Sequence, residues 1–189
     1  MEILLLNNTD EIRKSFIEHF VCSWDEFQVG HKRFIDECAK NKYIIDINWY
    51  NKAYLWDKLN FDVSVASFAS ALDALKKHND RVLIMSEDEK HPYPGELFYN
   101  NRKIKNFVAR VDANELAKLI EDEWYKVYRL AERNMYILNP ILPEDLYVFD
   151  ESMIWLIIFT HETMDWESEL DNPMKAAQSR YCIVYNNTK

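Results

Sequence analysis

The stretch EDLYVFDESMIWLIIFTHETMDWESELD, residues 144–171, decides the fold class of this chain. It holds nine carboxylates and no Lys or Arg, and these acids surround the apolar run Met153–Phe159. Two apolar runs separated by an Asp-containing turn are typical of paired strands. The stretch therefore predicts an antiparallel β-hairpin with a strongly negative end.

Helix and strand signals continue on both sides of this hairpin. The clearest helix signal is Ala113–Arg133, which begins with the capping box Asp112–Glu115 and carries one apolar stripe. Together the signals predict an α+β fold, a mostly antiparallel sheet of about five to seven strands with about three to four helices packed on it. Further helices are expected after Asn8, after Ser23, at Ser64–His78 and at Pro173–Ser179. Strands are expected at residues 2–6, 43–49, 81–86, 96–99, 104–111, 135–138, 145–149, 153–160 and 180–185.

The length of 189 residues suits a single domain spanning 1–189. The Pro- and Gly-containing loop Glu87–Gly95 is the best candidate for an internal seam. It would separate a helical N-terminal part, 1–86, from a sheet-rich C-terminal part, 96–189.

The charge balance bears on possible partners. The formal net charge is −9, and no basic block occurs in either half. Nucleic-acid binding depends on Lys and Arg at phosphates, so we expect no nucleic-acid partner. The same balance speaks against an anionic membrane surface and favours a basic protein partner.

Glycine and cysteine usage narrows the possible chemistry. Only two glycines occur, whereas loops that cradle phosphates need several, so nucleotide and dinucleotide fingerprints are excluded and no cofactor is expected. Cys22, Cys38 and Cys182 are widely spaced and odd in number, which is typical of reduced thiols. With no signal-peptide pattern and no long apolar run, a cytoplasmic location is expected.

The candidate binding face lies in the acidic C-terminal part of the hairpin stretch. One interpretation is an ordinary solvated loop. The other is a docking face for a Lys- and Arg-rich surface, because Trp is enriched in binding hot spots and opposite charges speed association. Acids left without neutralising bases repel one another, which favours the second interpretation. The predicted partner-binding residues are Glu162, Asp165, Trp166, Glu167, Glu169 and Asp171.

His161 is the first residue to consider for catalysis. A His beside a carboxylate such as Glu162 or Asp165 can form a base with its orienting group, or a pair of metal ligands. A HExxH zinc motif would require His at the position of Asp165, and the other histidines show no ligand spacing. A His that tethers a turn is therefore the favoured interpretation. We assign no catalytic residue and no metal ligand.

Other conspicuous residues have mainly structural interpretations. Asp145, Asp150 and Glu151 flank a predicted turn, where Asp is common, although paired carboxylates can also act as acid and base. Glu121–Glu123 is expected to be a solvated helix face. Cys22 and Cys38 lie on or near core stripes and should not be reactive. Trp24, Trp49, Trp56, Trp124 and Trp155 are expected in the core, while Tyr50, Tyr54 and Trp56 can alternatively line a groove.

The residues Asp145–Asp150, Trp155 and Thr160–Glu162 carry a resemblance to small bacterial α+β families. They resemble a C-terminal signature with a Tyr-containing strand, an Asp turn, a Trp strand and a closing His-Glu, over residues 130–165. Similar proteins are immunity partners in bacterial toxin systems and are commonly acidic. The chain departs from one such family where Cys182 is followed by Ile183 rather than Gly. The resemblance implies a cytoplasmic, immunity-like binding protein and transfers no catalytic residue.

The sequence is consistent with three hypotheses about function. The favoured one is a non-enzymatic protein-binding module that neutralises a basic partner through its acidic, aromatic face. One alternative is a hydrolase or metal-dependent enzyme that uses His161 with Glu162 or Asp165. The other is a structural or regulatory homo-oligomeric module.

Overall fold

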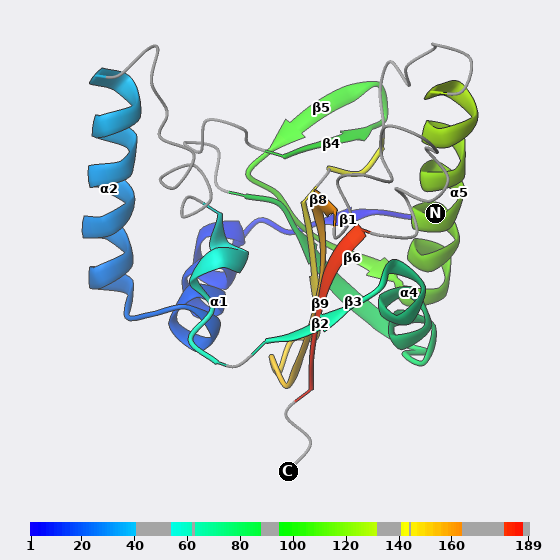
Figure 1. Ribbon diagram of the computed structural model, residues 1–189, viewed down its shortest axis with the longest axis horizontal. Helices are drawn as coiled ribbons and strands as arrows, with labels where there is room; N and C mark the ends of the chain where they lie inside the picture. The colour runs from blue at the N-terminus through cyan, green and yellow to red at the C-terminus, as the bar shows by residue number, and fades with distance from the viewer. Residues whose placement is uncertain are drawn as a thin grey trace.

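The computed structural model describes residues 1–40, 54–61, 63–87, 95–131, 141–143, 145–163 and 180–186. In these residues a seven-stranded sheet lies between two groups of helices, which confirms the α+β class (Figure 1). The helices are α1 (Thr9–Phe20), α2 (Trp24–Lys40), α4 (Phe68–Lys76), α5 (Ala113–Ala131) and the 3₁₀ helix η1 (Leu55–Lys58). The strands are β1 (Leu4–Leu5), β2 (Ser64–Ala66), β3 (Arg81–Met85), β4 (Glu96–Tyr99), β5 (Arg102–Lys105), β6 (Val108–Asp112), β7 (Leu146–Phe149), β8 (Trp155–Thr163) and β9 (Arg180–Asn186).

The large sheet has the strand order β1-β6-β3-β7-β8-β9-β2, and every neighbouring pair is antiparallel. Strands that precede and strands that follow the segment Glu87–Gly95 both belong to this sheet, and β3 lies between β6 and β7. The predicted hairpin is confirmed as β7 and β8, in which Phe149 pairs with Leu156 and Leu146 pairs with Phe159. β4 and β5 form a separate two-stranded sheet.

The sheet is buried on both faces, which explains the nearly continuous apolar runs of its central strands. Successive side chains of a strand point to opposite faces, so each strand supplies two cores. In Figure 1, α1 and α2 lie on one side of the sheet, and α4 and α5 lie on the other. The α1-side core includes Phe16, Phe20, Leu83, Met85, Tyr147, Phe149, Leu156 and Ile158. The α5-side core includes Leu72, Leu75, Val82, Ile84, Leu116, Val148, Ile157 and Phe159.

Side-chain caps fix the starts of α2 and α5. The Oγ atom of Ser23 accepts a bond from the Glu26 N–H and donates to the Glu26 carboxylate, as the capping box predicts. Asp112 accepts from the Glu115 N–H at 2.9 Å and opens α5. Asn8 precedes α1, but its side chain makes no capping bond.

The largest differences from the sequence prediction concern two elements. The expected helix Ser64–His78 is shorter, because residues 64–66 form β2 against β9 and Ser67 caps α4 by accepting from the Ser70 N–H. The expected strand 104–111 is two strands, β5 and β6. Asn106 separates them with a φ of 47°, a left-handed conformation that interrupts a strand. The β4–β5 turn at Asn100 and Asn101 is confirmed, with φ values of 51° and 60°.

Several expected features lie outside the described residues. These are the strands 43–49 and 135–138, the helical turns 173–179, and the side chains of Cys38 and Trp124. Among the described tryptophans, Trp155 is in the α5-side core, and Trp24 and Trp56 pack against the α1-side core, as expected. No helix in the described ranges is both long and apolar enough to cross a membrane.

Glu123 corrects the expectation of a fully solvated face on α5. Its carboxylate accepts hydrogen bonds from the Ile141 N–H at 2.6 Å and from the Leu142 N–H at 3.2 Å. Glu123 therefore anchors the chain segment that precedes β7. The neighbouring Glu121 remains at the surface, where it pairs with Lys76.

Candidate functional site

The predicted acidic face is mostly outside the described residues. Glu162 lies in β8, and the structure describes its backbone only. The face therefore stays a prediction. Its members outside the described residues are Asp165, Trp166, Glu167, Glu169 and Asp171.

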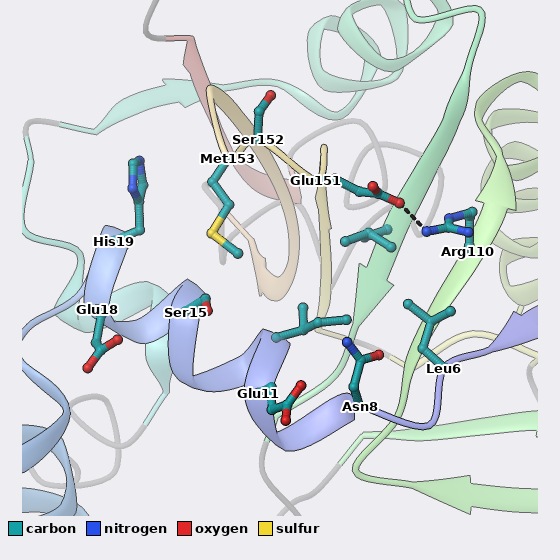
Figure 2. Close-up of a pocket in the computed structure, with 12 residues that line it drawn as sticks. Leu6, Asn8, Glu11, Ser15, Glu18, His19, Arg110, Glu151, Ser152 and Met153 are labelled. Carbon is teal, nitrogen blue, oxygen red and sulfur yellow. Dashed lines mark hydrogen bonds and ion pairs between the residues drawn. The ribbon is translucent and has the colours of Figure 1, made fainter.

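The described acids of the hairpin stretch that precede β8 have partners within the molecule. Asp150 accepts from the backbone N–H groups of Ser152 and Ile154, which makes it the structural acid of the turn, as expected. Glu151 forms an ion pair with Arg110 of β6 (Figure 2). The expectation that the hairpin end carries only uncompensated acids is therefore wrong for Glu151.

His161 is held by Asp145, which the sequence reasoning did not pair with it. The ring Nδ1 lies 2.9 Å and 3.0 Å from the two carboxylate oxygens of Asp145, and the His161 backbone N–H donates to Oδ1 at 3.1 Å. The two side chains are 24% and 9% exposed. A carboxylate can only accept in these contacts, so it fixes the orientation of the imidazole, as in a base with its orienting acid.

The strand pairing in the hairpin indicates which residues lie close to Asp145, and it could have predicted the contact with His161. Leu146 pairs with Phe159, so Asp145 lies next to the strand segment that follows Phe159. The pairing of β8 with β9 shifts between Phe159 and Thr163, and such irregularities redirect side chains. Counting back from the Asp150 turn therefore brings Asp145 near residues 160–161, whereas Glu162 and Asp165 were the partners proposed from sequence.

Aromatic rings from the η1 turn lie against His161. The ring centroids of Tyr54 and Trp56 are 4.9 Å and 6.2 Å from that of His161, and Trp56 is 6.0 Å from Tyr181. Tyr54 and Trp56 stack on one another at 5.6 Å. Tyr54 is only 2% exposed, so it belongs to the interior rather than to a groove. Tyr50, the third member of the predicted groove, lies outside the described residues.

A second buried pair, Glu87 and Tyr147, holds the same η1 turn. The Tyr147 hydroxyl donates to the Glu87 carboxylate, and both side chains are in the interior. Glu87 also accepts from the Leu55 N–H at 2.9 Å, and the Tyr147 oxygen accepts from the Trp56 N–H at 3.2 Å. This pair could not be predicted from the sequence, because Glu87 is the first residue of an acidic loop and its burial depends on tertiary packing.

The electrostatics of this buried cluster are strongly perturbed. Burial raises the pKa of Glu87 to about 7, and the Tyr147 and Leu55 hydrogen bonds and the charge of Arg13 offset part of that rise. Burial also raises the pKa of Tyr147 well above its usual value, and the charge on Glu87 raises it further. Burial lowers the pKa of Lys58 on η1. Perturbed groups of this kind are found both at functional sites and in structural networks.

A groove lies between α1 and the β7–β8 turn (Figure 2). Its volume is about 680 Å³, in the range of small-ligand and side-chain pockets. Its lining includes carboxylates, hydroxyls and apolar side chains. The lining residues are Leu6, Asn8, Glu11, Ile12, Ser15, Glu18, His19, Leu83, Arg110, Glu151, Ser152 and Met153.

The described residues do not assemble a metal site or a reactive thiol. No group of three or more His, Cys, Asp or Glu side chains is placed within reach of one ion in the described part of the chain. Burial, followed by the charge of Glu26, raises the pKa of Cys22, which keeps this thiol protonated. Cys182 is buried in the α5-side core.

Comparisons with known proteins do not assign the chain to a family. No protein-family model, no curated protein sequence and no solved structure matches it. The resemblance of residues 130–165 to toxin-immunity partners therefore stays a prediction. Function has to be argued from the charges and contacts of this chain itself.

Proposed function

We propose that the chain is a non-enzymatic protein-binding module that captures a basic protein, in the manner of an immunity protein that neutralises a toxin domain. The observation that carries the proposal is the acidic surplus, a net charge of −9 from 32 acids and 23 bases. A surplus of this size attracts cationic partners and accelerates their association.

Intramolecular ion pairs leave this surplus in place, because each pair engages an acid together with a base. Many described bases are already engaged by acids of the same chain, so they do little to repel an incoming cation. The surplus carboxylates are consequently left to the solvent and to partners. The surface ion pairs are Lys14–Glu18, Lys76–Glu121, Arg81–Glu2, Lys103–Glu96, Lys105–Glu96 and Arg110–Glu151.

The proposed contact face remains the acidic segment after β8. Within it, Trp166 would bury an aromatic side chain against the partner, while Glu167 and Glu169 would steer the encounter. Loss of a buried aromatic contact acts mainly on dissociation, and loss of a rim charge acts mainly on association.

The experiment is affinity capture from the cell of origin, with washes at low and high salt, followed by mass spectrometry. We expect a basic protein that is retained at low salt and released at high salt. With that partner purified, Trp166→Ala should speed dissociation and a Glu167→Lys/Glu169→Lys reversal should slow association. The matched control is Asp73→Lys/Asp122→Lys, which makes the same charge change at exposed positions of α4 and α5. Recovery of no basic partner at low salt, or equal effects of both reversals, would contradict the proposal.

The Asp145–His161 pair favours a second candidate function, hydrolysis with His161 as the base. Its carboxylate partner would be Asp145, in place of Glu162 or Asp165. The supporting observation is the contact of both carboxylate oxygens with Nδ1, at 2.9 Å and 3.0 Å. Turnover of p-nitrophenyl acetate tests this function, because His161→Gln and Asp145→Asn should both abolish it. Equal rates for the wild type and both variants would eliminate it.

A further inference from the structure

We infer that the groove between α1 and the β7–β8 turn receives a Lys- or Arg-bearing segment of the basic partner. The inference rests on the proposed function and adds a docking location that the sequence did not indicate. The groove adjoins the β7–β8 turn, at the Trp155 end of β8, whereas the acidic segment begins in sequence after the other end of the strand, Thr163.

The rim of the groove is acidic and is therefore complementary in charge to a basic segment. Glu11 and Glu18 come from α1, and Glu151 comes from the turn across the groove. The single arginine of the lining, Arg110, is already engaged by Glu151. Glu11 forms no ion pair with any Lys, Arg or His in the described ranges, so it is available to a cation from outside.

Glu18 is available as well, in spite of its contact with Lys14. That ion pair spans 3.9 Å, and its side chains are 49% and 47% exposed, so solvent competes with it. Exposed pairs of this kind add little stability and exchange readily. A partner cation that enters the groove can therefore replace Lys14 at small cost.

The floor of the groove is apolar. Ile12, Leu83 and Met153 contribute apolar side chains to the lining, and Met153 extends from the turn toward α1 in Figure 2. Lys and Arg carry long methylene stems beneath their charged heads, and such side chains cover apolar surface while the charge stays at a polar rim. A groove with an apolar floor and an acidic rim therefore fits a Lys or Arg side chain, which has an apolar stem and a positively charged head.

The same features argue against other occupants. An anion would meet three carboxylates, and the one arginine that could hold it is taken by Glu151. Met adapts its shape at binding surfaces, which suits a segment whose sequence is not fixed in advance. The volume of about 680 Å³ accommodates a few side chains rather than a whole folded surface. The occupant is accordingly an exposed basic segment of a protein.

The test uses a capped hexalysine peptide titrated into the ¹⁵N-labelled full chain at low salt. We expect the largest amide shifts at residues 8–19 and 150–154. The double variant Glu11→Gln/Glu18→Gln should weaken binding about threefold to tenfold, the effect of losing two exposed ion pairs. The control Asp73→Asn/Asp122→Asn changes the net charge equally at α4 and α5, across the sheet, and should leave affinity within the error of the measurement.

The apolar floor is tested with Met153→Asn. Met153 has a φ of 54°, a left-handed conformation that Asn tolerates, so the turn should be kept while the apolar side chain is removed. We expect weaker hexalysine binding with an unchanged fold, as judged by the spectrum outside the groove. Unchanged affinity in this variant would show that the floor plays no part and would overturn the proposed mode of docking.

A triple variant, Asp165→Asn/Glu167→Gln/Glu169→Gln, separates the two proposals. Binding that survives the groove variants but is lost in the triple variant would overturn the groove and leave the proposed function standing. Equal weakening by the groove variant and the Asp73/Asp122 control would also overturn the groove, since only net charge would matter. If hexalysine fails to bind the wild type at low salt, the proposed function fails with it.

Discussion

The Tyr147 hydroxyl donates to the Glu87 carboxylate while it accepts a hydrogen bond from the Trp56 N–H, so the two residues jointly fix the η1 turn. The Glu87 carboxylate also accepts from the Leu55 N–H. Tyr147 is in β7, and Glu87 lies just beyond Ser86, the residue that follows the neighbouring strand β3. This pairing is the reason that Trp56 is positioned beside His161. It also makes the stability of the fold dependent on pH.

The first prediction concerns Glu87→Gln and pH. The pKa of Glu87 is raised from 4.5 to about 7, so between these values the folded chain holds a proton that the unfolded chain has released. The contribution of Glu87 to stability is therefore complete below pH 4.5 and is lost as pH rises through about 7. The full shift corresponds to about 3 kcal/mol in the free energy of unfolding.

Gln keeps an acceptor for Leu55 and Tyr147 but cannot ionise, so Glu87→Gln should gain stability relative to wild type as pH rises. Urea unfolding at pH 5, 6, 7 and 8 measures this difference directly. The matched control is Glu121→Gln, a surface acid, whose difference from wild type should stay small across the range. Parallel pH profiles for wild type and Glu87→Gln would contradict the buried ionisation.

The second prediction is that Tyr147→Phe destabilises the fold by about 1–3 kcal/mol. The variant keeps the ring but removes the hydroxyl, which leaves Glu87 with one donor fewer and the Trp56 N–H without its acceptor. Chemical denaturation measures the loss, and near-ultraviolet circular dichroism reports on the packing of Trp56. Tyr185→Phe is the control, because its phenol is only half-buried and its ring packs against Phe61. A Tyr147→Phe variant as stable as this control would argue against the bond to Glu87.

The third prediction is that Asp145→Ala costs about 2–3 kcal/mol and that Asp145→Asn costs less. Ala removes the acceptor of both the His161 backbone N–H and its ring Nδ1, whereas Asn retains one carbonyl oxygen for them. Long-range ¹H–¹⁵N spectra of the imidazole should show the proton on Nδ1 in the wild type, because a carboxylate is only an acceptor. A proton found on Nε2 alone would refute the proposed orientation of the ring.

The fourth prediction contrasts the chain's two glycines. A Cβ at Gly95 would lie 2.6 Å from Pro143 Cβ and 3.0 Å from Ser86 Cβ, so Gly95→Ala should destabilise by about 1–3 kcal/mol. A Cβ at Gly30 on α2 meets nothing within 4 Å, so Gly30→Ala should stabilise by about 0.5–1 kcal/mol through helix propensity. Thermal unfolding of the two variants should therefore shift in opposite directions. Shifts of the same sign would contradict the close approach at Gly95.

The elements that were predicted correctly are those whose capping residues and apolar periodicity agree with the contacts that they make in the folded chain. The box Asp112–Glu115 opens α5 as expected, and the Asp150 turn joins β7 to β8. In both cases the deciding hydrogen bonds join residues close in sequence, so a short window contains the information. The same is true of the turn at Asn100 and Asn101.

The features that were predicted wrongly or not at all depend on contacts between residues distant in sequence. Val65 fits a helical stripe in sequence, but the pairing of β2 with β9 makes Ser64–Ala66 a strand, and Ser67 then caps the helix. The ionisation of Glu87 could not be predicted, because it depends on burial beneath η1 and on the hydroxyl of Tyr147. The groove was also missed, since its two walls come from α1 and from the β7–β8 turn.

The position of β9 between β8 and β2 has a consequence for synthesis of the chain. As the ribosome extends the polypeptide, Ser64–Ala66 emerges early, yet the strand that accepts its backbone hydrogen bonds is Arg180–Asn186. Until Arg180–Asn186 has emerged, β8 lacks its neighbouring strand, and its apolar edge is open to pairing with other nascent chains. The sheet is therefore completed only after β9 has emerged, and a chaperone that shields β8 until then would protect this protein from aggregation.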